Sequence, residues 1–266
     1  MDTGLKRILI KILKYFDVDL LAHAHVQIGV GHNTYNSGEE YVIENLISKI
    51  LKREPEIIFD AGANDGEYAK LLANRFKTAR IFCFEPVPSN YEKLTLNTAG
   101  LNTINILSAL GSEIGNIKLY MGDNNKDGKM ATSYRETLDT IFLFTGDVNH
   151  VVDSPVTTID DFCNGTIAKI DFLKIDVEGH ELEVLKGAAN MISKNLVSII
   201  QYEFSEFNIF SRSFMYDFYQ LLKSYDMYRV MPQNKLFPLG SYTSVHEIFR
   251  YQNILAIHKS LNYSNE

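Results

Sequence analysis

Short apolar runs alternate along this chain with stretches in which apolar residues recur at helical spacing. The runs predict strands near 56–60, 80–85 and 104–109, and the spaced stretches predict helices at 66–76 and 88–98. Strands that alternate with helices in this way favour a parallel, doubly wound sheet. The first half of the chain therefore predicts an α/β fold.

The same alternation returns in the second half. It predicts strands near 171–176, 197–204, 226–231 and 253–258, with helices at 180–192 and 213–224. Between the halves, residues 111–158 interrupt the pattern, with strand-like runs near 117–121 and 151–159 around a Gly-, Asn-, Asp- and Lys-rich stretch at 122–134. Long insertions in compact domains are usually functional or disordered. We expect a mobile, substrate-facing lid, formed by 122–134 together with 205–212.

Two helical patterns precede the first strand. They cover residues 5–16 and 39–52, and a loop is expected between them at 23–37. We therefore expect a helical extension or lid at 1–54, followed by a main domain at 55–266 that carries the insertion. With 266 residues, the chain is long enough for one α/β domain with a sizeable core.

The loop after the first predicted strand carries the clearest sign of a ligand site. The strand ends at Asp60, and Gly62, Asn64, Asp65 and Gly66 follow before the helix. Glycines permit positive φ and close approach of the backbone to a ligand, and the N–H groups at a helix start favour a negative group. A dinucleotide fingerprint would read G-x-G-x-x-G, and Asn64 stands here where its second glycine would be.

The ends of the next two strands extend this site. Glu85 follows the second strand, at about the 20-residue spacing at which an acid holds a ribose diol in nucleotide-binding α/β folds. The Pro86-x-Pro88 turn stiffens the loop that holds Glu85. Because successive strand ends meet at one edge of the sheet, we expect Ser108, Ala109 and Leu110 to contact an adenine ring.

A third polar cluster follows the strand at 171–176. Asp176, Glu178 and His180 lie within one short turn before the next helix, and Glu203 ends the following strand. Helix capping would explain one or two of these acids. The C-terminal edge of an open α/β sheet is where such proteins bind ligands.

Three motifs together resemble the FkbM-type family of methyltransferases. They are D-A-G-A-N-D-G-x-Y, F-E-P-x-P-x-N-x-x-x-L and D-F-L-K-I-D-V-E-G-H-E-x-x-V-L-x-G-A, and they lie between about Ile57 and Phe204. The resemblance implies a Rossmann-like methyltransferase sheet of seven strands, mostly parallel with one antiparallel strand and with helices on both faces. It also implies S-adenosyl-L-methionine as cofactor, and O-methylation of a hydroxyl on a sugar, glycan or polyketide-type small molecule.

Within that expectation, each candidate residue has a role. Gly62, Asn64 and Asp65 would line the methionine end of the cofactor, with Asp60 and Asp176 beside them. His180 is the natural general base, because its unperturbed pKa lies near neutrality. Glu178 and Glu203 could orient His180 or serve as the base themselves.

A metal-assisted route through Asp176, Glu178 and Glu203 is an alternative, since carboxylates suit Mg²⁺ or Ca²⁺. No dedicated metal spacing supports it, and we assign no metal ligand. Two other functions remain open, an NAD-dependent sugar-modifying enzyme and a non-catalytic cofactor-binding subunit. The glycine loop departs from the pattern that the first would need, and the acid–histidine cluster argues against the second.

Charge and cysteine content narrow the picture further. A net charge of −7 gives no general attraction to phosphate backbones, so nucleic acid is a poor candidate substrate. The two cysteines, Cys83 and Cys163, suggest neither a disulfide framework nor a zinc site, and they fit a reducing cytoplasm.

The apolar stripe within residues 5–16 is broken by lysines, and it is too short to span a bilayer. It could dock on its own domain, on the second copy of a homodimer, or peripherally on a membrane.

Overall fold

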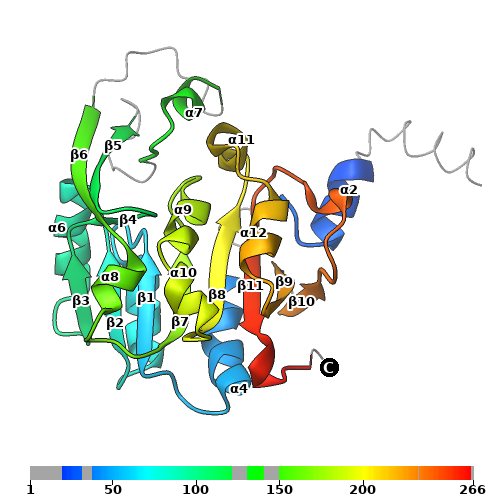
Figure 1. Cartoon of the computed structure of the whole chain (residues 1–266), viewed down its shortest axis with the longest axis horizontal. Coiled ribbons are helices and arrows are strands. Elements are labelled where there is room, and N and C mark those ends of the chain that lie inside the picture. The colour runs from blue at the N-terminus through cyan, green and yellow to red at the C-terminus, as the bar shows by residue number, and fades with distance from the viewer. Residues whose placement is uncertain (1–19, 32–37, 122–130, 141–149, 233, 265–266) are drawn as a thin grey trace, which may run out of the picture.

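The structure is a computed structural model that describes residues 20–31, 38–121, 131–140, 150–232 and 234–264. An eight-stranded sheet runs through the middle of the molecule (Figure 1). In spatial order its strands are Lys235–Pro238 (β10), Tyr225–Met231 (β9), Gln252–His258 (β11), Val197–Phe204 (β8), Ile170–Ile175 (β7), Ile57–Ala61 (β1), Arg80–Phe84 (β2) and Thr103–Ile106 (β3).

Five neighbouring strands, from β3 through β2, β1 and β7 to β8, are parallel. Strand β11 runs antiparallel to both of its neighbours, β8 and β9. The predicted α/β fold with a mostly parallel sheet is therefore confirmed. The sheet has one strand more than expected, because β10 pairs antiparallel with β9 at the edge.

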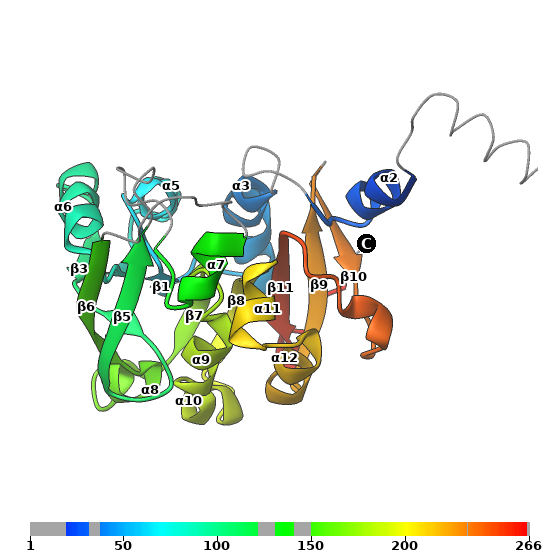
Figure 2. The same ribbon diagram turned by 90° about the horizontal axis from the view of Figure 1, so that it is seen from above.

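Helices cover both faces of this sheet, and each face has its own apolar cluster (Figure 2). One face carries Ile159–Cys163 (α8), Glu181–Lys186 (α9), Ala189–Ser193 (α10) and Met215–Leu221 (α12). The other carries Glu67–Arg75 (α5), Pro88–Asn97 (α6) and a helix formed by Glu39–Tyr41 (α3), Val42–Leu46 (η2) and Ile47–Leu51 (α4). The buried residues of η2 and α4 pack with Ile58 and Phe172 of the sheet, so this part of the N-terminal segment belongs to the core.

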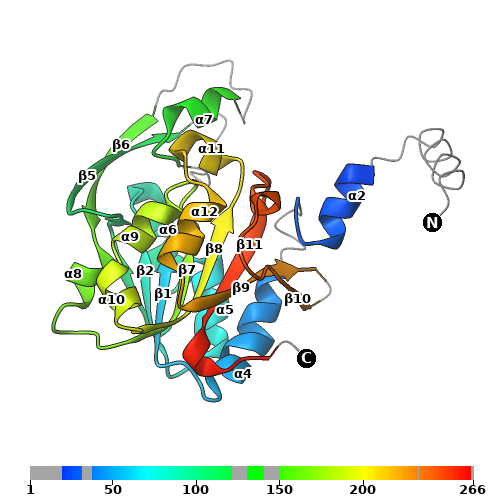
Figure 3. The same ribbon diagram turned by 45° about the vertical axis from the view of Figure 1, so that its right-hand side comes forward.

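The insertion folds as a second, three-stranded sheet, and its helix α7 (Arg135–Thr140) lies between this sheet and α11 (Phe207–Ser211) (Figure 3). The strands of this sheet are Ala109–Leu110 (β4), His150–Thr157 (β6) and Gly115–Met121 (β5). We refer to β5, β6, α7 and residues 131–134 as the arm. Residues 122–130 of the expected mobile loop lie outside the described residues.

Three local expectations were wrong. Helix α2 occupies Leu20–Gln27, where a loop was expected from His23 onward, because no glycine or proline interrupts the chain before Gly29. The strand expected at 104–109 divides into β3 and β4, which belong to different sheets. The helix expected at 180–192 divides into α9 and α10 around Gly187, where an added Cβ would lie 1.9 Å from the Gly111 carbonyl oxygen.

The helical pattern at 5–16 lies outside the described residues. Short 3₁₀ turns, Ser244–His246 (η3) and Lys259–Leu261 (η4), flank β11. Within the described ranges, no helix is long and apolar enough to cross a membrane.

Candidate functional site

A cavity of about 920 Å³ opens at the C-terminal ends of the central strands. Its volume is within the usual range for small-molecule sites. Ten of the eleven residues proposed from the sequence line it, from both halves of the chain. They are Asp60, Gly62, Asn64, Asp65, Glu85, Ala109, Asp176, Glu178, His180 and Glu203.

Ser108 does not line this cavity. It is buried, and its hydroxyl donates to the backbone oxygens of Ala109 and Pro155, at 2.9 Å and 3.0 Å. Ser108 therefore joins β4 to β6 at the base of the arm, while Ala109 and Leu110 face the cavity. The sequence placed the right segment at this wall but could not show which of its side chains turn away.

The glycine loop after β1 is fixed by its backbone. Gly62 has a φ of +83°, and an added Cβ would lie 1.8 Å from the carbonyl oxygen of Asp176. The N–H groups of Gly62 and Ala63 both donate to the carbonyl oxygen of Phe84, at 3.0 Å each. The loop thus packs tightly between the ends of β2 and β7.

Glu85 holds this loop from the next strand end. Its carboxylate accepts from the backbone N–H groups of Asn64, at 2.9 Å, and Val87, at 2.8 Å. Burial raises the pKa of Glu85 to about 7, and these two hydrogen bonds oppose the rise. Each carboxylate oxygen can accept more than one hydrogen bond, so Glu85 can still bind a diol while it holds the loop.

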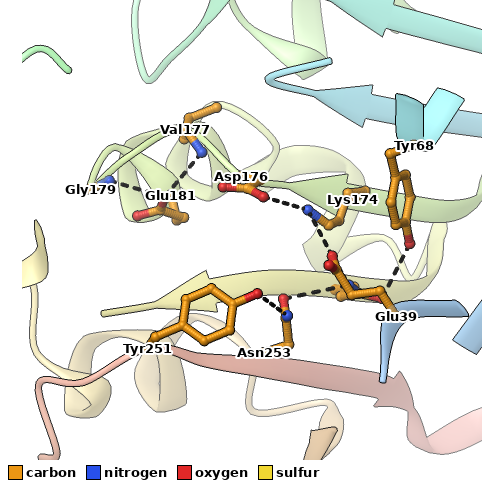
Figure 4. Close-up of polar contacts among 10 residues, drawn as sticks. Glu39, Tyr68, Lys174, Asp176, Val177, Gly179, Glu181, Tyr251 and Asn253 are labelled. Atoms are coloured by element: carbon orange, nitrogen blue, oxygen red, sulfur yellow. Dashed lines mark hydrogen bonds and ion pairs between the residues drawn. The ribbon is translucent and has the colours of Figure 1, made fainter. Parts of the chain in front are cut away.

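A buried lysine of β7 also lines the cavity (Figure 4). The Nζ of Lys174 lies 2.9 Å from Asp176 Oδ2 and 3.3 Å from Glu39 Oε1, and it sits 4.9 Å from the centre of the Tyr68 ring. Burial opposes its charge, but Asp176 and Glu39 together hold the pKa of Lys174 well above its usual value.

A network of hydrogen-bonded side chains lies next to this lysine (Figure 4). Gln201 of β8 donates to Glu39 at 3.1 Å and accepts from the Tyr68 hydroxyl at 3.4 Å. On β11, Asn253 donates to the hydroxyl of Tyr251 at 3.0 Å.

Glu39, Tyr68, Lys174 and Tyr251 all line the cavity, and sequence reasoning missed all four. The available signal was Lys174, a buried charged residue between the apolar Leu173 and Ile175 of β7.

The turn after β7 depends on a side chain for its shape. Glu181 is 1% exposed, and its Oε1 accepts from the N–H groups of Val177 and Gly179, at 3.1 Å each (Figure 4). Glu178, between them, has a φ of +54°, which is uncommon outside glycine. Burial raises the pKa of Glu181 to about 7.

Several carboxyl groups lie close together at this turn, and burial together with their proximity raises the pKa values of Glu178 and Glu203. Burial, together with the nearby carboxylates of Asp176 and Glu181, raises the pKa of Glu178 well above its usual value. The pKa of Glu203, buried at the end of β8, is raised in the same way, by burial and then by Asp176 and Glu178. A raised pKa favours the protonated form of a carboxyl group, in which it can donate a hydrogen bond.

The arm contacts this turn directly. The Thr132 hydroxyl donates to the carbonyl oxygen of Glu178 at 3.1 Å, and the Tyr134 hydroxyl lies 3.3 Å from His180 Nδ1. Burial lowers the pKa of His180, so its imidazole is neutral at physiological pH. When Nδ1 carries the hydrogen and donates to Tyr134, the lone pair of Nε2 is free to accept a proton.

In the described part of the chain, no group of three or more His, Cys, Asp or Glu side chains is arranged to hold a metal ion. The metal-assisted alternative through Asp176, Glu178 and Glu203 therefore has no preformed ligand set among these residues.

Comparison with known proteins gives this site a context. The chain is 33% identical over 167 residues to the hexuronic acid methyltransferase AglP of Haloferax volcanii, covering 61% of this chain and 62% of that protein. It is 24% identical over 173 residues to the 2-O-methyltransferase NoeI of Sinorhizobium fredii, covering 62% of this chain and 70% of that one. The match to AglP thus spans less than two thirds of that relative's length.

A crystal structure of the methyltransferase FkbM from Methylobacillus flagellatus KT superimposes with a TM-score of 0.49 at 17% identity, covering 86% of this chain and 48% of that one. Residues 60–229 match the family described as the methyltransferase FkbM domain. This range contains the glycine loop, Glu85, the acid turn and Glu203, and it is more than half of the chain. The chain therefore belongs to the FkbM methyltransferase family.

Proposed function

We propose that this protein is an S-adenosyl-L-methionine-dependent O-methyltransferase that acts on a hydroxyl of a sugar, glycan or polyketide-type small molecule. One observation carries the proposal. A single cavity is lined by the glycine loop and Glu85 and also by His180 and its neighbouring acids. A nucleoside cofactor and a proton acceptor can therefore meet in one space.

The cavity's residues fit the proposed cofactor. Among the described lining residues, nine are Asp or Glu, and Lys174 is the only lysine or arginine. This excess of acids suits a cationic sulfonium. Glu85 is 4% exposed and offers a carboxylate to the ribose hydroxyls, and Ala109 and Leu110 offer apolar surface to the adenine ring.

In the proposed site, Gly62, Asn64 and Asp65 line the methionine end, with Asp60 and Asp176 beside them. When bound, the cofactor supplies an electrophilic methyl group. The protein's part is to place the acceptor hydroxyl in line with that group, exclude water and remove the hydroxyl proton.

We assign His180 as the general base. Its lowered pKa keeps it neutral and able to accept a proton, whereas Glu178 and Glu203 have raised pKa values and tend to be protonated. Those two acids then act as donors that orient the acceptor. Tyr134 and Thr132 of the arm contact this turn, which supports the arm as the acceptor-facing lid.

The acceptor class draws on the relatives. Two of them are a hexuronic acid methyltransferase and a 2-O-methyltransferase. We carry over from them only a carbohydrate or similar hydroxyl acceptor. A cytoplasmic location, suggested by the buried free thiols of Cys83 and Cys163, stays a prediction.

The decisive experiment has two stages. Calorimetry should first show binding of S-adenosylhomocysteine and no binding of NAD. Purified protein with radiolabelled S-adenosylmethionine should then transfer label to members of a panel of sugars, nucleotide sugars and lipid-linked glycans. Binding of NAD instead would support a dehydrogenase. Suppose that S-adenosylhomocysteine binds but no label is transferred to any acceptor of the panel, including products of enzymes encoded by neighbouring genes. That result would support a non-catalytic subunit.

A further inference from the structure

We propose that Lys174 and Asp60 bind the amino-acid tail of the cofactor, with Lys174 receiving its carboxylate and Asp60 its ammonium group. The proposal rests on the proposed function, because it assigns two residues to that cofactor. It also gives the N-terminal segment a part in the site, through Glu39, which contacts Lys174.

The two side chains are placed as a pair. Asp60 and Lys174 are direct partners across the parallel strands β1 and β7, and neighbouring strands lie about 4.8 Å apart. Both residues line the cavity, and they are 2% and 3% exposed. A zwitterion needs one cation and one anion at such a spacing, and this pair supplies both.

Each of the two also has bonding capacity left for a ligand. The Oδ2 atom of Asp60 is buried and finds no hydrogen-bond partner among the described residues. The ammonium of Lys174 has three N–H donors. In the described part of the chain its ion pairs are with Asp176 and Glu39, which leaves one donor. An unsatisfied buried carboxylate oxygen is costly, so a bound ammonium group would satisfy it.

The order of residues along the cavity wall matches the order of groups in the cofactor. In the main sheet, Lys174 on β7 and Asp60 on β1 come first, Gly62 follows at the end of β1, and Glu85 at the end of β2. Ala109 lies on β4 of the second sheet, which follows β3 in the chain. In the cofactor the tail is followed by the sulfonium, the ribose and the adenine. With the ribose at Glu85 and the adenine at Ala109, the tail lies over β1 and β7.

Glu39 modulates the Lys174–Asp60 pair, which we refer to as the clamp. Its Oε1 atom accepts from Lys174 at 3.3 Å and from Gln201 at 3.1 Å, so helix α3 closes the tail end of the cavity. Its negative charge also faces the incoming carboxylate and repels it. The variant Glu39→Gln keeps an oxygen for both donors and removes that repulsion. It should therefore strengthen the preference for a ligand that carries the carboxylate.

The test compares three ligands by calorimetry: S-adenosylhomocysteine, its decarboxylated analogue and its deaminated analogue. The unmodified protein should favour the complete ligand over each analogue by on the order of 10–100-fold, the range for hydrogen bonds to charged groups. Lys174→Met should abolish the preference for the carboxylate and keep the preference for the ammonium. Asp60→Asn should do the reverse. Lys186→Met is the control, because Lys186 lies on α9 with a side chain 51% exposed.

Other outcomes would overturn the clamp. They are equal binding of all three ligands by the unmodified protein, or equal loss of both preferences in both variants. If Lys174→Met does not fold, Glu39→Gln decides: a stronger carboxylate preference supports the clamp, and an unchanged or weaker one contradicts it. Absence of S-adenosylhomocysteine binding in the unmodified protein would instead refute the proposed function itself.

Discussion

Two neighbouring turns line the cavity, and they are built by different means. The glycine loop after β1 is fixed by sterics and backbone hydrogen bonds, with Gly62 pressed against Asp176 and the loop held by Glu85. The acid turn after β7 is fixed by the Glu181 side chain and by the arm, through Thr132 and Tyr134. The first turn admits little variation in shape, while the second depends on parts that can change independently of it.

Under the proposed function, this difference separates cofactor binding from acceptor recognition. In the proposed function, the tightly packed loop binds a cofactor whose structure does not vary. The acid turn and the arm face an acceptor that differs between enzymes. We expect substitutions in the first turn to affect folding and cofactor binding, and substitutions in the second to affect turnover.

Removal of the proposed base should give the largest effect and sharpen the comparison. His180→Ala should lower kcat by roughly 10²–10⁴-fold, the usual contribution of a general base. The affinity for S-adenosylhomocysteine should stay nearly unchanged, which steady-state kinetics and calorimetry would check together. If the variant stays active while a chelator abolishes turnover, a metal route through Asp176, Glu178 and Glu203 replaces this assignment.

The glycine loop can be broken sterically. Gly62→Ala should lower the free energy of unfolding by about 3 kcal/mol or more, because the new Cβ would overlap the Asp176 carbonyl at a positive φ. Urea denaturation would measure it. Gly100→Ala is the matched control, since Gly100 has a similar φ of +79° but no atom within 4 Å of the added Cβ. It should lose only about 1 kcal/mol, and equal losses in both would refute the steric argument.

A milder change in the same region tests Glu85. Glu85→Gln should weaken S-adenosylhomocysteine binding by about 1–3 kcal/mol, because it removes the charge from the hydrogen bonds to the ribose. An analogue without the ribose hydroxyls should bind both proteins almost equally. The exposed Glu92 of α6 provides the control, as Glu92→Gln. Unchanged affinity in a folded Glu85 variant would remove this residue from the site.

Proton binding by Asp60 should give the smallest effect. Burial raises the pKa of Asp60 to about 7, Lys174 opposes the rise, and Asp176, Glu39 and Glu85 add to it. A pKa raised by folding means that this group's stabilisation is complete below the unfolded pKa and is lost as pH rises through about 7. Between pH 5.5 and 7.5, the unliganded protein should lose about 1–2 kcal/mol from this group. Denaturation at both pH values, compared with Asp60→Asn, isolates the contribution, and an equal pH response in both proteins would contradict it.

The sequence predicted most of the parallel sheet because apolar strands and spaced helices leave strong local patterns. It also predicted the cavity-lining positions at or just after strand ends, such as Asp60, Glu85 and Asp176. Strand β10 was missed because it is a four-residue edge strand that ends in Pro238, and its pairing is set by its neighbour β9.

The missed site residues have a common cause. Glu39 and Lys174 meet only because the chain brings helix α3 onto β7, and the sequence around each residue does not identify its partner. The Tyr134–His180 contact likewise joins an insertion to a motif. Ser108 was assigned to the site because of its place in the chain, next to Ala109. Its side chain turns toward Pro155 and does not line the cavity. Contacts between distant segments are the part that local patterns do not contain.

The arm leaves and rejoins the domain at adjacent points, because Ala109 and Leu110 of β4 pair directly with Val156 and Thr157 of β6. A segment with neighbouring ends can be exchanged by recombination without altering the path of the remaining chain. The base of the arm is tightly packed, because the Gly111 carbonyl oxygen leaves no room for a side chain at position 187. Under the proposed function, chimaeras that exchange residues 112–155 between relatives, and keep both glycines, should change acceptor specificity and leave cofactor binding unchanged.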